Sequence, residues 1–190
     1  TELVDKGDIT CHAEKVKGGY VLNGTKIFIS NGHLSTWHIV VAYEDLKKPS
    51  KSMVMLAVKT GTKGFALGRQ EIKMGQKACP ASELVFKDCF IPDEYVCIDA
   101  DQMKHPGLST KEITQRIIDF VLAPSRAGVG AFGTGVARGA YESALHFASE
   151  TKIAGKLLIN HEWAQCMLAE MHKNVMLARL SYIETIYANA

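Results

Sequence analysis

The feature that most constrains this chain is a series of glycine-containing turns, spaced at hairpin length through its first half. Short apolar runs at residues 20–22, 27–30, 39–43, 53–58 and 84–90 are separated by Gly18-Gly19, Asn23-Gly24, Asn31-Gly32 and the segment 61–64. Asn-Gly and Gly-Gly pairs supply the positive φ angles that two-residue hairpin turns need. Residues 9–91 are therefore expected to form a small antiparallel β-barrel or β-sandwich.

The second half reads as helix. Ser109-x-x-Glu112 matches a capping box ahead of an apolar run at residues 113–122. Pro124 is expected to end or kink that helix, because proline lacks the backbone N–H. Helical character resumes at residues 126–152, and another helix runs from residue 160 to beyond 187. In this last helix an apolar stripe is expected from Trp163, Met167, Met171, Val175, Ala178 and Tyr182, which recur at helical spacing.

These patterns predict an α+β chain. A β domain over residues 1–98 is expected to pass through a linker at residues 99–112 into a helical domain at residues 113–190. The last stripe continues almost to Ala190 without a Gly or Pro stop, and the helices present are too few to cover each other. We therefore expect a partial helical bundle whose remaining helices lie outside this sequence.

Composition excludes several classes of protein. A net charge of +2, with scattered lysines, gives no electrostatic case for a nucleic-acid partner. The five cysteines are odd in number and contain no C-x-x-C pair, which argues against a disulfide framework and favours a reducing compartment. No apolar run approaches the roughly 18 residues of a membrane span. We expect no membrane-spanning segment.

Two motif matches fail on their context. Gly128-x-Gly130-x-x-Gly133 spells a dinucleotide fingerprint, but a helical pattern precedes it where the fingerprint needs a strand. Close helix packing through one face with Gly128, Ala131, Gly135 and Gly139 is expected instead. His161-Glu162-x-x-Gln165 lacks the second histidine of a zinc-protease motif, so no metal site is expected. Neither a catalytic nucleophile nor a general base is identifiable in these residues.

Phe28 and Ser30 form the candidate ligand site. They stand two apart in a predicted strand, and such residues point to the same face. A flat ligand would then find a stacking surface and a hydrogen-bonding hydroxyl together. The alternative is an ordinary half-buried strand that ends at Asn31-Gly32.

Several motifs occur in an order that resembles the acyl-CoA dehydrogenase family. The β half contains Gly19-Tyr20-Val21-Leu22-Asn23-Gly24-Thr25-Lys26, Lys73-Met74-Gly75-Gln76 and Leu84-Val85-Phe86-Lys87-Asp88. The helical half contains Arg126 before a Gly/Ala-rich helix, Gly155-Lys156-Leu157-Leu158, His161 and Met167-Leu168-Ala169-Glu170-Met171. The resemblance implies a further helical domain before this β domain, and a bundle longer than the one present.

The resemblance also implies site residues. The tripeptide Phe28, Ile29 and Ser30 takes the place of the family's flavin-contacting W-I-T-like segment, and Thr1 opens a loop that touches flavin. His161 and Glu162 occupy an adenosine-contact position of FAD. For the acyl-CoA substrate, the matching positions are Arg126, Ser125 and Ser50. The chain departs from the family at Thr151, where an arginine of an R-x-x-F-G motif usually reaches the FAD pyrophosphate of a neighbouring subunit.

The function implied is FAD-dependent α,β-dehydrogenation of an acyl-CoA thioester, with the β-hydride passing to flavin N5. The catalytic glutamate is expected beyond Ala190, because Ser125 stands at the family's other known position for it. An electron-transferring flavoprotein or similar acceptor, and a homodimer or homotetramer, are expected. The expected location is the bacterial cytoplasm or, as an alternative, the mitochondrial matrix.

Two alternatives to this function remain open. One is a non-catalytic, dehydrogenase-like subunit with a structural role, which the missing arginine at Thr151 favours. The other is a flavin oxidase or monooxygenase on the same scaffold. The retained Phe28 and Ser30 favour an enzyme.

Overall fold

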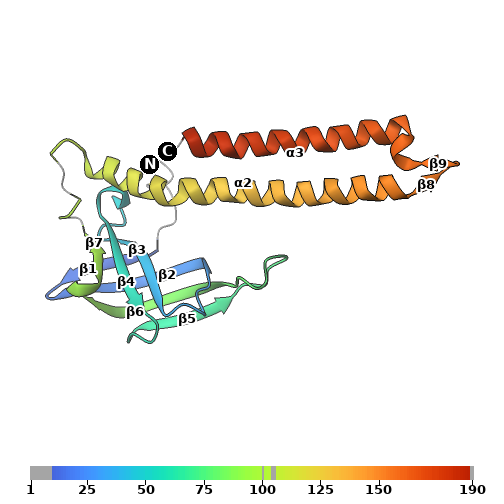
Figure 1. The fold of residues 1–190 in the computed structure, drawn as a ribbon. Coiled ribbons are helices and arrows are strands. Elements are labelled where there is room, and N and C mark those ends of the chain that lie inside the picture. Colours follow the sequence, from blue (N-terminus) through green and yellow to red (C-terminus); the bar gives the residue numbers. More distant parts are fainter. Residues whose placement is uncertain (1–9, 100, 104–105, 189–190) are drawn as a thin grey trace. The chain divides into compact units, whose positions relative to one another are not determined.

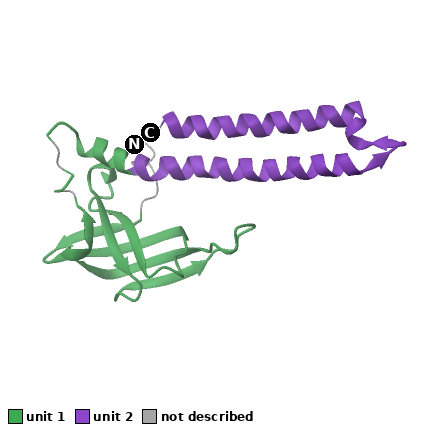
Figure 2. Ribbon diagram, in the orientation of Figure 1, with its two compact units in different colours: residues 1–117 green, residues 118–190 purple. Residues whose placement is uncertain are grey.

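The computed structural model describes residues 10–99, 101–103 and 106–188, and the chain divides into two compact units, residues 1–117 and 118–190 (Figure 2). A sheet dominates the first unit and two long helices dominate the second (Figure 1). The expected α+β class, a β domain followed by a helical domain, is confirmed.

The first unit contains one seven-stranded sheet. Its strands are β1 (His12–Val16), β2 (Gly19–Ser30), β3 (Trp37–Tyr43), β4 (Met53–Lys59), β5 (Phe65–Gln70), β6 (Ala81–Pro92) and β7 (Val96–Ile98). The order across the sheet is β5-β6-β2-β1-β3-β4-β7, and neighbours are antiparallel except for a single parallel pair between β1 and β3. Short 3₁₀ helices, η1 (Pro49–Lys51) and η2 (Asp93–Tyr95), connect strands. The strands of the described residues do not close into a barrel, because β5 and β7 are not paired with each other.

Alternating side chains build the core of this sheet. On β4, Val54, Leu56 and Val58 are fully buried, as expected where alternate residues of a strand point to one face. They join a cluster with Leu22 of β2 and Leu84 of β6, among other residues. Burial of one such aliphatic side chain stabilises a fold by about 1.5–3 kcal/mol. The apolar runs in the sequence therefore mark the strands that build this core.

The predicted turn at Asn23-Gly24 is wrong, because β2 continues through both residues. The Asn23 side chain instead bonds a bulge on β6: its Oδ1 accepts from the Asp88 N–H at 2.8 Å, and its Nδ2 donates to Asp88 Oδ1 at 3.3 Å. Gly24 has φ +126°, and a β-carbon there would overlap the carbonyl oxygen of Thr10. Asn23 therefore binds the bulge of β6, and Gly24 allows the Thr10 backbone to approach closely.

Helix α2 (Thr110–Glu150) begins at the predicted capping box. Ser109 Oγ donates to Glu112 Oε2 at 2.7 Å, and the Glu112 N–H donates to Ser109 Oγ at 3.3 Å, which confirms that prediction. The helix does not end at Pro124, which lies inside it. Pro124 and Phe120 are both exposed, so water can solvate the carbonyl that loses its helical partner.

The second unit continues from α2 through a small hairpin into α3 (Glu162–Ala188). The hairpin consists of β8 (Lys152–Ile153) and β9 (Lys156–Leu157), followed by η3 (Leu158–Asn160). Ala154 and Gly155 both have positive φ, at 50° and 81°, as a type I′ turn requires. Within this unit, α2 and α3 run side by side in opposite directions (Figure 1).

The predicted stripe on α3 is only partly correct. Val175 is buried, but Trp163 and Met167 are 55% and 59% exposed. At this end of α3, Ala164 and Leu168 pack instead, against Ala148 of α2. The face of α3 that packs is set by its contacts with α2 and η3, which helical period alone does not reveal.

The glycines of α2 also differ from expectation. Residues 128–133 lie inside the helix, so the dinucleotide fingerprint is excluded as predicted. Close packing through Gly128, Gly135 and Gly139 is wrong for the described structure, since no atom lies within 4 Å of a β-carbon built at these positions. The close approach occurs at Gly130, where that β-carbon would lie 3.2 Å from Cβ of Tyr182.

Candidate functional site

The candidate flavin segment lies at a bulge of β2. Lys26 pairs with Leu84 and Ile29 pairs with Ser82, so Ile27 and Phe28 together face Glu83 of β6. A second bulge, on β5, faces the same residue, because Leu67 pairs with Leu84 and Gln70 with Ser82. Bulges re-aim side chains and often stand beside binding sites.

The bulge turns Phe28 outward. Its φ is +58°, a left-handed conformation that costs a non-glycine residue about 1–2 kcal/mol. Phe28 is 64% exposed, Ser30 is exposed, and Ile29 between them packs against the core. An exposed aromatic ring and a hydroxyl thus flank one inward residue, and this arrangement fits a flat ligand with polar edges.

The turn after Ser30 is rigidly held. The Asn31 N–H donates to the carbonyl oxygen of Pro80 at 2.7 Å, and the Asn31 carbonyl accepts from Leu34 and Ser35, each at 2.9 Å. Asn31 has φ +58°, which asparagine tolerates better than most residues. The predicted turn at Asn31-Gly32 is confirmed, and it fixes the end of the strand that carries Ser30.

A cavity of about 350 Å³ opens beside Ser30. β1 pairs with β2 only as far as Asn23, and among the described strands nothing pairs with that edge of β2 beyond it. The cavity occupies the resulting slit between β2 and β3. Its lining includes Lys26, Ile29 and Ser30 of β2, Trp37 and His38 of β3, and Leu84 of β6.

His38 closes one wall of this slit and is held in a polar network. Thr60 Oγ1 donates to the Ser35 carbonyl at 2.7 Å and accepts from His38 Nε2 at 3.0 Å. Burial lowers the pKa of His38, while a hydrogen bond with the Ser35 backbone opposes that shift. The imidazole also packs against the ring of Phe65 in a tilted arrangement, with centroids 5.2 Å apart and an angle of 53° between the planes. His38 therefore serves as a neutral structural group at neutral pH.

The second unit carries the other candidate residues in two separate places. Ser125 and Arg126 are exposed on α2, and Arg126 lines a cavity of about 450 Å³ with Ser181 and Thr185 of α3. His161 directly precedes α3, which begins at Glu162. The His161 side chain contacts the hairpin, because its Nε2 lies 2.9 Å from the Ile153 carbonyl oxygen. The helix between Arg126 and Glu150 is about 36 Å long, so these two places form no single local site.

Three further residues named in the sequence analysis are Thr1, Ser50 and Thr151. Thr1 lies outside the described residues. Ser50 is 4% exposed within η1, and its proposed contact with acyl-CoA stays a prediction. Thr151 lies directly after α2, where its N–H donates to Phe147 and its carbonyl accepts from Leu158 at 2.8 Å. The sequence analysis did not predict that Lys26 and His38 line the slit beside Ser30. The slit lies where β1 stops pairing with β2, and no local sequence pattern shows where that pairing stops.

The described residues form neither a metal cluster nor a membrane-spanning helix. Within residues 10–99, 101–103 and 106–188, no three His, Cys, Asp or Glu side chains are grouped as a metal ion would need. None of the helices described combines the length and apolar character that crossing a membrane demands.

Comparison with known proteins agrees with this architecture. The model of the acyl-CoA dehydrogenase middle domain matches residues 4–89, and the model of the acyl-CoA dehydrogenase C-terminal domain matches residues 115–190. A probable acyl-CoA dehydrogenase, fadE25 of Mycobacterium bovis, is 32% identical over 161 residues, which cover 85% of this chain and 39% of that protein. Acryloyl-CoA reductase (NADH) of Anaerotignum propionicum is 34% identical over 84% of this chain and 38% of its own length.

The fold is shared with solved structures. Butyryl-CoA dehydrogenase from Megasphaera elsdenii superposes with a TM-score of 0.76 at 28% identity, over 95% of this chain and 45% of that one. The chain thus spans less than half the length of each of these proteins. Two family models in sequence, relatives above 30% identity and a common fold lead to one assignment: this chain belongs to the acyl-CoA dehydrogenase family.

Proposed function

We propose that the intact protein is an FAD-dependent acyl-CoA dehydrogenase, which removes the α-proton and the β-hydride of an acyl-CoA thioester. The observation that carries the proposal is the β2 bulge, where the exposed, strained Phe28 and the exposed hydroxyl of Ser30 flank the inward Ile29. Strained backbone of this kind persists where surrounding structure over-determines it, and it concentrates at ligand sites.

FAD fits the chemistry of these residues. When bound, FAD accepts the β-hydride at N5 of its flavin ring. Phe28 would pack on the ring, Ile29 would anchor the strand in the core, and the Ser30 hydroxyl would donate to the polar edge of the ring. Thr1, His161 and Glu162 are proposed as further FAD contacts, the last two toward the adenosine.

The acyl-CoA contacts are proposed for Arg126, Ser125 and Ser50. A guanidinium offers charge-assisted hydrogen bonds to phosphate or carbonyl oxygens, and Arg126 is exposed beside a cavity that also presents Ser181. The glutamate that abstracts the α-proton is proposed to lie beyond Ala190. The reverse reaction is a second candidate activity, since one relative is named an acryloyl-CoA reductase.

The proposal extends to partners and location. An electron-transferring flavoprotein or similar acceptor would take the electrons, and a homodimer or homotetramer would provide contacts between subunits. The bacterial cytoplasm is the proposed location. The competing proposal is a non-catalytic subunit of the same fold, which the neutral Thr151 favours because the family places a phosphate-binding arginine there.

The test separates the ligand role of Phe28 from a structural role. Asparagine adopts the left-handed conformation more readily than phenylalanine, so Phe28→Asn should keep the bulge while it removes the aromatic surface. We expect the intact protein to show a flavin absorption band after reconstitution with FAD. Phe28→Asn should bind FAD at least about tenfold more weakly, because it loses the apolar area that the ring would bury as well as about 0.5–1.5 kcal/mol from the stacked aromatic pair.

The controls decide between the two proposals. The unfolding free energy of the Phe28→Asn protein without cofactor should be unchanged or higher, since backbone strain is relieved. An intact protein that takes up no FAD supports the non-catalytic subunit. Equal FAD affinity in both proteins would remove Phe28 from the site.

A further inference from the structure

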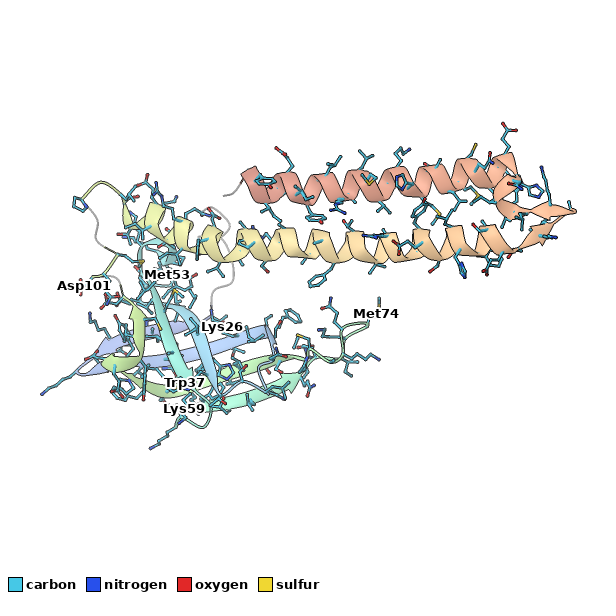
Figure 3. The ribbon with its side chains drawn as sticks, viewed as in Figure 1. Lys26, Trp37, Met53, Lys59, Met74 and Asp101 are labelled. Atoms are coloured by element: carbon cyan, nitrogen blue, oxygen red, sulfur yellow. The ribbon has the colours of Figure 1, made fainter. Side chains whose placement is uncertain are left out.

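We propose that Lys26 is a site of covalent acylation, at which its Nζ attacks the carbonyl carbon of a small acyl thioester in the cavity beside Cys11. Lys26 lies on β2, four residues before Ser30 (Figure 3). It lines two cavities, the slit of about 350 Å³ beside Ser30 and a second cavity of about 640 Å³. A reagent of acetyl size can therefore approach its side chain from solvent.

The surroundings of Lys26 are unusual for a lysine. The second cavity also presents Cys11, Tyr43 and Glu83, and the slit presents His38. Lys26 is partly buried, and within the described part of the chain its ammonium group makes neither a side-chain hydrogen bond nor an ion pair, although its backbone pairs with β6. Glu83 instead accepts from the Arg69 N–H at 3.2 Å. A partly desolvated ammonium without a charge partner is costly, and the cost falls when the group releases its proton.

The pKa values agree with this geometry. Burial lowers the pKa of Lys26, and the nearby Cys11 opposes that shift only in part. Burial also raises the pKa of the Cys11 thiol, although the Lys26 charge counteracts it. At neutral pH the amine therefore has a larger nucleophilic fraction than an exposed lysine, whereas the thiol stays protonated and unreactive.

The reaction balances without a further reagent. The Nζ lone pair forms a C–N bond to the acyl carbon, the C–S bond breaks, and the proton from Nζ passes to the departing thiolate. The products are an acyl-lysine amide and a free thiol. The amide is neutral and larger than the amine, and it would lie in the slit that Ser30 lines.

Acyl-CoA as the natural acyl donor rests on the proposed function, whereas the reactivity of Lys26 toward thioesters does not. The experiment incubates the intact protein with acetyl-CoA, and separately with S-acetyl-N-acetylcysteamine, and follows acetylation of each lysine by mass spectrometry. The exposed Lys63 and Lys87 of the same unit are internal references. We expect Lys26 to react at least about tenfold faster than either at neutral pH, and this advantage to shrink as pH approaches about 10, where exposed amines also deprotonate.

Two controls test whether the folded structure and the Cys11 thiol determine the reactivity of Lys26. Unfolding in concentrated urea should abolish the preference for Lys26, because every lysine is then exposed. Cys11→Ser should leave the rate at Lys26 within about twofold, because the protonated thiol takes no part. A preference that survives urea, loss of reaction in Cys11→Ser, or equal rates at the three lysines in the folded protein would each overturn the proposal. Flavin content is measured on the same samples, so a failure here is distinguished from a failure of the proposed function.

Discussion

At the scale of single residues, positive φ angles mark the positions where this chain departs from regular structure. Asn31 and Asp88 tolerate φ values of +58° and +49°, but Phe28 at +58° pays a larger cost. Gly24 and Gly61 both have positive φ, yet their surroundings differ. A β-carbon at Gly24 would meet the Thr10 carbonyl and lie 2.8 Å from Cα of Cys11, whereas one at Gly61 would meet nothing within 4 Å.

This pair of glycines makes a matched prediction. Gly24→Ala should lower the unfolding free energy by more than about 2 kcal/mol, because backbone strain adds to a clash with a neighbouring backbone that cannot move aside. Gly61→Ala should cost only about 1 kcal/mol, which is the conformational term alone. Urea unfolding of both variants gives the comparison. Equal losses would show that the sheet relaxes around residue 24.

At the scale of elements, the clearest local device is the N-terminus of α2. Ser109 and Glu112 exchange hydrogen bonds there, and the Ser109 N–H also donates to Glu112 Oε2 at 2.8 Å. The Ser109 hydroxyl first, then its backbone N–H and the charge of Arg116, lower the pKa of Glu112. A carboxylate is also favoured at this end of a helix by the helix dipole.

The lowered pKa of Glu112 predicts how stability changes with pH. A folded-state pKa below the unfolded value of about 4.3 means that the ionised form stabilises the fold above that value. The stabilisation is lost as pH falls through the lower folded pKa. The difference in unfolding free energy between the parent protein and Glu112→Gln should therefore be largest near neutral pH and shrink in acid. A difference that is constant with pH would show that the ionised carboxylate contributes nothing.

At the scale of the whole molecule, each unit has a core of its own. One core fills the sheet, and a smaller cluster of Ala148, Leu158 and Ala164 joins the ends of α2 and α3. Thr151 directly precedes the hairpin between those helices, at the position where the resemblance described above implies an arginine. Because the backbone groups of Thr151 are bonded to Phe147 and Leu158, its side chain can be changed without breaking the hairpin.

FAD affinity should respond to this position. Thr151→Arg should tighten FAD by about tenfold, because a charge-assisted contact to phosphate is restored, and Thr151→Lys should do less since it cannot bind two oxygens in a fork. The contact is expected to cross between subunits, so dilution that dissociates the oligomer should release flavin in parallel. Dissociation constants for the three proteins, with sedimentation, test this. Tight binding by the parent protein that Thr151→Arg leaves unchanged would show that other residues replace the arginine.

The sequence by itself determined the features that depend on near neighbours in the chain. The capping box at Ser109, the Asn31-Gly32 turn and the change from strands to helices follow from interactions within a few residues, so their patterns were readable. Family membership was readable for the same reason, since its motifs are short words in a fixed order. The expected roles of Phe28, Ser30, Arg126 and His161 remain proposals.

Only the tertiary structure decided which residues meet across long separations. Asn23-Gly24 resembled a turn, but pairing with β6 and the approach of Thr10 make it part of a strand. The stripe on α3 was partly misplaced because contacts with α2 and η3 decide which face packs, and Gly130 rather than Gly128 approaches α3. Nothing in the sequence around Lys26 predicts that it lines a slit, which lies where β1 no longer pairs with β2. Bulges, helix rotation and burial depend on partners distant in sequence, and no local pattern contains them.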